Sequence, residues 1–279
     1  MINITNREIY LGLAAIILIR VISIYFFADE RIENEWGVML YNLENYQILS
    51  IRSIDGYLVP NLFMPPLYPV FLFLIKSTIN NSQSFLNVIF LIQLLFSVTS
   101  VILIYKILLQ LFSKNLSLVG TIIYAFFPLN VYAVSQTSSV VLQIFLLNTF
   151  IYSFIKLFKK DKLYYFFIFS LSSALLILLR GEFFLFVILT QIYILINNKK
   201  LSKFILTIFL IIILISPYLY RNYKIFGEIT ITKSLGFNLL KGNNPKSKVE
   251  GVPLFGEEVL ILPELKNEIT NLNNSNDLK

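Results

Sequence analysis

The stretch FLNVIFLIQLLFSVTSVILIYKILLQLF, residues 85–112, contains a single charged side chain, Lys106. A membrane-spanning helix needs roughly 20 mainly apolar residues, and this stretch is longer than that. It therefore predicts a helix that crosses a lipid bilayer. The composition of the whole chain agrees, with 57% hydrophobic residues, 14% charged residues and a mean hydropathy of +0.74. Such a chain is too apolar to form a water-soluble domain.

Similar apolar stretches lie on both sides of residues 85–112, and together they predict about seven membrane spans. The predicted spans cover residues 9–27, 85–112, 116–134, 140–158, 163–179, 183–196 and 204–220. The predicted fold class is an all-α integral membrane protein, a multi-pass helical bundle. We divide it into a transmembrane core at 1–220, which includes a long loop at 29–84, and a C-terminal segment at 221–279.

Lysines mark every second connection between the predicted spans and so indicate the orientation of the chain. Cytoplasmic connections carry an excess of Lys and Arg. The loop 29–84 and the segment after residue 220 then lie on the opposite face. We expect a plasma (inner) membrane protein whose two charged, turn-rich stretches, 26–43 and 216–245, are both extracytoplasmic. The lysines are Lys114, Lys156, Lys159, Lys160, Lys162, Lys199, Lys200 and Lys203.

Two side-chain types are absent from the chain, and their absence excludes whole classes of chemistry. There is no cysteine and no histidine, so thiol nucleophiles, disulfides and Ser-His triads are excluded. Acid–base chemistry is left to Asp, Glu, Lys or Tyr. The net charge of +7 does not indicate a nucleic-acid partner, because the lysines lie between hydrophobic segments rather than along one helix face.

The long loop contains two patterns typical of short helices at a membrane surface. Apolar residues mingle with polar ones around Trp36, which suits a short helix lying in the interface. The segment MPPLYPVFLFLIK, residues 64–76, begins with Pro65 and Pro66 and continues as an apolar run too short to span the bilayer. We expect a juxtamembrane or re-entrant helix there.

Several motifs recur in a fixed order along the chain. An acidic cluster, DERIENE at 29–35, follows the first span, and Pro-Leu-Tyr-Pro at 66–69 follows it. Leu179-Arg180 ends a later span, and the chain then reads PYLYRNYKIFG at 217–227 and GFNLLKGNNP at 236–245. This order resembles the bacterial branch of the polytopic C-type glycosyltransferases, which are relatives of the dolichyl-phosphate-mannose protein mannosyltransferases and of the lipid A aminoarabinose transferase.

The resemblance implies an enzyme that moves a sugar from a polyprenyl-phosphate donor to an extracytoplasmic acceptor hydroxyl with inversion. The acceptor would be a glycan, a lipid or a protein, and the partners are the donor and membrane lipid. No cofactor is certain, and a divalent cation is an open candidate. Relatives continue past the Gly-Asn-Asn-Pro motif into further helices or a soluble domain, whereas residues 246–279 follow here. A naturally short, split or truncated chain would each account for that difference.

The acidic cluster supplies the candidate catalytic residues. Such a reaction needs a carboxylate that accepts the proton of the attacking hydroxyl. Asp29 and Glu30 match the family's acidic pair in position and type, and Glu33 competes by its distance from Trp36. We favour Asp29. The competing interpretation is that DERIENE is a solvated helix start with Asp29 as its N-cap.

Cations and amides near the outer face supply candidates for binding the donor phosphate, whose negative charge grows as the glycosidic bond breaks. Each also has an ordinary explanation: an arginine reaching the interface, a local ion pair with Glu182, a cation at a helix C-terminus, or a plain turn. The candidates are Arg20, Arg180, Arg221, Asn222, Lys241, Asn243 and Asn244.

A second class of function competes with the enzyme. A lipid or solute transporter would show pseudo-symmetric halves and broken midplane helices, and neither is visible in the sequence. A non-catalytic scaffold or partner subunit would not need acids and arginines gathered on one face. We therefore expect a glycosyltransferase.

Overall fold

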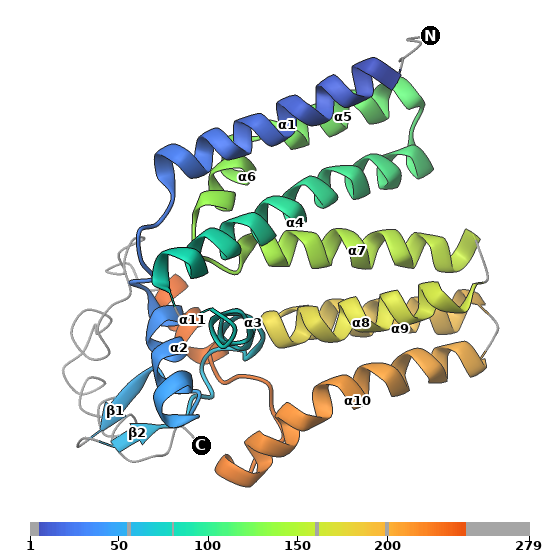
Figure 1. Ribbon diagram of the computed structural model, residues 1–279. Coiled ribbons are helices and arrows are strands. Elements are labelled where there is room, and N and C mark those ends of the chain that lie inside the picture. Colours follow the sequence, from blue (N-terminus) through green and yellow to red (C-terminus); the bar gives the residue numbers. More distant parts are fainter. Residues whose placement is uncertain (1–5, 55–56, 80, 160–161, 199–200, 244–279) are drawn as a thin grey trace.

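The computed structural model describes residues 6–54, 57–79, 81–159, 162–198 and 201–243. Its long helices lie side by side, and a shorter helix, α5 (Lys114–Ala125), returns the chain between the second and the third of them, so successive connections fall at opposite ends of the bundle (Figure 1). These helices are α1 (Asn6–Phe27), α4 (Ser82–Leu111), α7 (Val140–Lys159), α8 (Leu163–Leu179), α9 (Phe183–Asn198) and α10 (Leu201–Phe226).

The centre of the bundle is formed by α7, which packs between α4 and α8. Beyond α8 lies α10, α9 contacts both of them, and α1 packs against α4. The fully buried rings of Phe150, Phe166 and Phe169 fill the core. Buried serines on the two central helices, Ser153 on α7 and Ser173 on α8, keep side chains small where helices approach, as is typical of packing in membranes.

The predicted class is confirmed, but the predicted count of seven spans is not. Among the residues that the structure describes, four helices, α1, α4, α7 and α10, are long and apolar enough to cross a membrane. A fifth span results if α5 (Lys114–Ala125) and the segment Pro128–Ser135 are taken together, although they are bent by 56°. The apolar helices α8 and α9 have 17 and 16 residues, which is short of the roughly 20 that a span requires.

The bend has a local cause in the sequence. Pro128 is the first residue of α6 (Pro128–Tyr132), which runs directly into the 3-10 turn η1 (Ala133–Ser135). Because proline lacks an N–H and disfavours helix in the residue before it, α5 stops ahead of Pro128 and a new helix begins there. The apolar run 116–134, which predicts one span, is therefore divided at a bend between α5 and α6.

One end of the bundle carries an additional layer of short elements (Figure 1). The two short helices expected in the long loop are confirmed as α2 and α3, and a two-stranded antiparallel hairpin lies between them. Asn34 caps α2 by accepting a hydrogen bond from the Trp36 N–H at 3.1 Å. The elements are α2 (Glu35–Tyr46), β1 (Arg52–Ile54), β2 (Tyr57–Val59), α3 (Leu67–Lys76) and α11 (Leu235–Gly242).

Both charged stretches of the sequence meet in this layer, although they lie at opposite ends of the chain. α2 comes from the first, and the end of α10 with α11 comes from the second. α10 continues past Tyr220 as far as Phe226, so the expected boundary at residue 220 falls inside a helix. The described lysine-bearing connections, with Lys114, Lys159 and Lys162, lie at the other end of the bundle.

Candidate functional site

A cavity of about 730 Å³ lies between the end of the bundle and the layer of short elements. This volume is typical of small-ligand sites. The lining combines an apolar surface with a few polar groups. The apolar residues are Trp36, Phe63, Met64, Pro65, Leu179, Phe184, Ile215, Leu219, Ile229, Ile231 and Leu235. The polar and charged residues are Glu35, Ser139, Arg180, Glu182, Thr230, Thr232, Ser234 and Asn238. Gly181, between Arg180 and Glu182, also lines the cavity.

Arg180 supplies the positive charge of the described lining. It is the C-cap residue of α8, and its backbone N–H donates to Leu176 O at 2.8 Å. Its side chain is 42% exposed and stands 3.7 Å from a Glu182 carboxylate oxygen. An exposed ion pair at this separation contributes little to stability. The guanidinium is therefore free to turn toward an anionic ligand in the cavity.

Asp29 lies beside the cavity rather than in its lining. Its Oδ2 accepts hydrogen bonds from the backbone N–H and the hydroxyl of Thr137, at 2.6 and 2.7 Å. Its backbone N–H donates to Ser135 O at 3.1 Å. The half-buried carboxylate is thus fixed in one orientation by the turn that precedes α7. Ser139, two residues past Thr137, belongs to the cavity lining.

The other two predicted acids are less constrained. Glu30 is exposed, and Glu33 forms an exposed ion pair with Arg31. Neither lines the cavity. Glu35, in the first turn of α2, belongs to the 29–35 cluster and does line the cavity, as Arg180 does. Within the described part of the chain, no group of three or more carboxylates gathers as a metal-binding cluster.

Tyr68 packs against the cavity wall and feels the charge of Asp29. Its ring packs edge-on against Trp36, with 5.2 Å between the ring centroids. Its hydroxyl is buried and has no hydrogen-bond partner among the described residues. Burial, reinforced by the negative charge of Asp29, raises the pKa of the Tyr68 hydroxyl above its usual range. The phenol therefore stays protonated and neutral beside the carboxylate.

Arg20 lies away from the cavity, buried inside the bundle. Its Nε donates to Ser97 Oγ at 2.7 Å, its Nη1 to Ile16 O at 3.0 Å and its Nη2 to Ala125 O at 3.1 Å. Ala125 is the last residue of α5, where the helix ends and leaves carbonyl groups unpaired. Arg20 therefore satisfies a carbonyl at the break between α5 and α6.

Replacing Arg20 by alanine should lower the stability of the protein. The change leaves Ala125 O and Ser97 Oγ without their partner, and a buried unsatisfied group costs about 1–3 kcal/mol. We expect a lower unfolding temperature in detergent, with partial recovery in Arg20→Lys. Arg31→Ala, which removes an exposed arginine, is the control. An unchanged unfolding temperature in Arg20→Ala would show that the bend does not depend on this side chain.

The remaining candidates lie around the ends of α10 and α11. Arg221 and Asn222 are in the last turns of α10 and do not line the cavity. Asn243 is the C-cap residue of α11, and its side chain donates to Leu239 O at 2.8 Å. Lys241 lies in α11, and Asn244 is outside the described residues. The first part of the GFNLLKGNNP motif is helical, and its Asn238 faces the cavity.

Sequence reasoning missed several of the cavity residues. Glu35 was visible in the acidic cluster, but its place in an expected interfacial helix gave no reason to prefer it. The segment that carries Thr230 and Thr232 has no motif of its own, and only its contacts with distant segments bring it to the site. Its polar, β-branched side chains directly after a long apolar helix were the available signal.

A bundle of apolar helices with a partly polar cavity at one end defines a polytopic membrane protein with a candidate ligand site. A sequence model of the family described as dolichyl-phosphate-mannose-protein mannosyltransferase matches residues 64–220. The chain belongs to this family, and it is therefore a membrane glycosyltransferase. The match includes Arg180 and the Pro-Leu-Tyr-Pro segment, and it ends before Arg221. No curated protein and no solved structure gives a significant match.

Proposed function

We propose that the chain transfers a sugar from a polyprenyl-phosphate donor to an acceptor hydroxyl outside the cytoplasm, with inversion at the anomeric carbon. The cavity carries this proposal, because it combines an arginine, nearby carboxylates and an apolar wall at one end of a membrane bundle. A lipid-linked sugar requires a cation for its phosphate, polar groups for its sugar and an apolar surface for its lipid chain.

The donor would enter along the apolar wall. Ile215 and Leu219 of α10 and Phe184 of α9 line the cavity on the side of the helical bundle. An isoprenoid chain is stabilised against such residues. Its phosphate would then lie near Arg180, whose planar guanidinium can donate two parallel hydrogen bonds to phosphate oxygens. Thr230, Thr232 and Asn238 offer hydrogen-bonding groups to the sugar.

The transfer step requires one proton acceptor. The acceptor hydroxyl attacks the anomeric carbon on the face opposite the phosphate, so a new C–O bond forms while the bond to the phosphate oxygen breaks. The hydroxyl proton passes to a carboxylate, and polyprenyl phosphate leaves with the electron pair. We assign the carboxylate to Asp29, because Thr137 fixes its orientation and a positioned group is required. Glu35 is its competitor because it lines the cavity.

The activity can be tested in proteoliposomes that contain the purified full chain and polyprenyl-phosphate mannose with a radiolabelled sugar. Membrane lipids, envelope glycans and envelope proteins are supplied as separate acceptor fractions. We expect label to move to one fraction while unglycosylated polyprenyl phosphate appears in equal amount. A panel of other polyprenyl-phosphate sugars tests the identity of the sugar. A chain that consumes no donor with any fraction, or that only moves intact donor across the bilayer, would contradict the proposal.

The orientation gives a separate prediction. The chain has no cysteine, so single cysteines can be introduced without background labelling. Tyr57→Cys, 80% exposed on β2, should react with an impermeant thiol reagent added outside cells. Lys162→Cys, exposed at the lysine-bearing end, should react only after the membrane is permeabilised. The reverse pattern would place the cavity on the cytoplasmic face.

A further inference from the structure

Two neighbouring residues at the end of α10 connect two separate walls of the cavity. Arg221 Nη1 donates to Asn61 O at 3.0 Å and to Asn222 Oδ1 at 2.8 Å. Asn222 Nδ2 donates to Thr230 O at 2.7 Å. The asparagine is fully buried. The pair therefore holds the turn at 61–65 on one side and the segment 228–234 on the other.

The turn at 61–65 is organised around Asn61, which is 4% exposed. Its Oδ1 accepts from the N–H groups of Phe63 and Met64, at 2.7 and 3.0 Å, and its Nδ2 donates to Met64 O at 2.8 Å. Phe63, Met64 and Pro65 all line the cavity. Anchoring the Asn61 carbonyl therefore sets the position of this whole wall.

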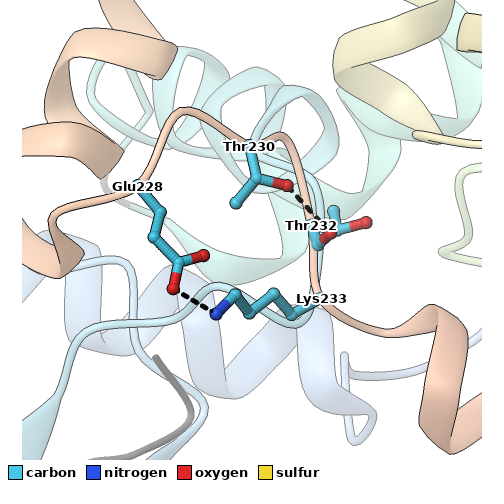
Figure 2. A network of polar contacts seen from close by, with 4 residues as sticks. All are labelled: Glu228, Thr230, Thr232 and Lys233. Carbon is cyan, nitrogen blue, oxygen red and sulfur yellow. Dashed lines mark hydrogen bonds and ion pairs between the residues drawn. The ribbon is translucent and has the colours of Figure 1, made fainter.

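The segment 228–234 is the second wall, and Figure 2 shows its internal contacts. Lys233 Nζ pairs with Glu228 Oε1 at 2.6 Å, and Thr230 Oγ1 donates to Thr232 O at 3.2 Å. The segment begins after Gly227, whose φ of 73° ends α10. The Lys233 backbone N–H donates to Leu62 O at 2.9 Å, so the two walls also touch directly.

A third contact fixes the segment against the turn that holds Arg180. A side chain at Gly181 would place its Cβ 3.1 Å from Thr232 Oγ1, which is tighter than ordinary packing. Glycine therefore allows the Thr232 side chain to pack closely against the backbone of this turn. Any displacement of 228–234 would change the space beside Arg180.

We infer that Arg221 and Asn222 are positioning residues: they hold the turn at 61–65 and the segment 228–234, the two walls of the donor cavity, in fixed positions relative to each other, and they do not themselves bind the donor. Neither lines the cavity, and both Nη1 hydrogens of Arg221 are already used within the protein. The guanidinium also lies 5.7 Å from the ring centroids of Tyr218 and Phe226, which enclose it. The effect on transfer rests on the proposed function, whereas the effect on the walls does not.

Asn222→Asp is the most selective variant for a test. It keeps an oxygen that accepts from Arg221, but it loses the N–H donor to Thr230 O. We expect segment 228–234 to become mobile while Arg221 and its charge remain in place. Lys224→Ala is the matched control, because Lys224 is an exposed cation two residues further along the same helix.

The measurement is a distance distribution between spin labels at Leu91→Cys on α4 and Ile229→Cys on the segment, two exposed positions in the cysteine-free chain. The protein is reconstituted in nanodiscs. Asn222→Asp and Arg221→Ala should broaden the distribution, and Lys224→Ala should leave it unchanged. With polyprenyl-phosphate mannose as the probe, Asn222→Asp should raise the donor KM about 3- to 10-fold, with a smaller change in kcat.

The outcomes separate this inference from the proposed function. A distribution that stays narrow in Asn222→Asp overturns the inference, whatever the activity. The inference is also overturned if Arg221→Ala keeps a narrow distance distribution but weakens donor binding, because Arg221 would then contact the phosphate itself. The two claims can also separate. If the distance distribution broadens in Asn222→Asp, the positioning role is supported. If the protein without this substitution transfers no sugar, the proposed function is contradicted.

Discussion

Asp29→Asn should slow sugar transfer by about 10²- to 10⁴-fold, the usual contribution of a positioned general base. The substitution keeps the size of the side chain and an oxygen that can accept from Thr137, but it removes the ability to take up a proton. Because the group acts in the transfer step, donor affinity should change little. Turnover and donor binding can be measured separately with polyprenyl-phosphate mannose and purified variants of equal thermal stability.

Glu35→Gln is the matched comparison, because Glu35 is the acid of the same cluster that lines the cavity. A small effect in Glu35→Gln beside a large effect in Asp29→Asn assigns the base to Asp29. The opposite result moves the role to Glu35 and leaves Asp29 with its structural contacts to Thr137. Glu30→Gln and Glu33→Gln serve as exposed controls and should be close to normal.

Arg180→Ala should weaken donor binding by about 10- to 100-fold, which corresponds to the loss of a charge-assisted hydrogen bond. Arg180→Lys should recover part of this loss, because lysine keeps the charge without the planar fork of donors. The measurement is donor affinity in nanodiscs at low and high salt.

Glu182→Gln is the control for this prediction, since it removes the 3.7 Å partner of Arg180 and leaves the cation in the cavity. Donor binding should be unchanged or stronger in this variant. Normal donor affinity in Arg180→Ala would mean that the phosphate lies elsewhere, with Lys241 of α11 and Arg221 as the remaining sequence candidates.

The fold class was predictable because it depends on composition and on the length of apolar runs. The short helices α2 and α3 were predictable too, from an amphipathic pattern and from Pro65-Pro66 ahead of an apolar run. The number of spans was less predictable, because residues 116–134 are mainly apolar on both sides of Pro128 and a hydropathy pattern does not reveal a bend. Proline was the available signal.

The site was only partly predictable. Arg180 was found because the Leu179-Arg180 pair at the end of a span matches the family resemblance, and the structure places Arg180 in the cavity lining. Arg20 has the same chemistry, but its donors meet Ser97 and Ala125, which are far away in sequence. A single sequence does not say which distant carbonyl an arginine will reach. The contact between Asn222 and Thr230 depends in the same way on the path of the chain after α10.

The most direct test of the central claim is where the donor binds. A polyprenyl-phosphate mannose with a photoreactive group near the phosphate can be crosslinked to the full chain in proteoliposomes and mapped by mass spectrometry. We predict crosslinks to the turn at 179–184 and to 228–238, which are lost with excess unlabelled polyprenyl phosphate and reduced in Arg180→Ala. Crosslinks spread over the lipid-facing surfaces of α1 and α5, and equally formed by polyprenol without a phosphate, would contradict a donor site in this cavity.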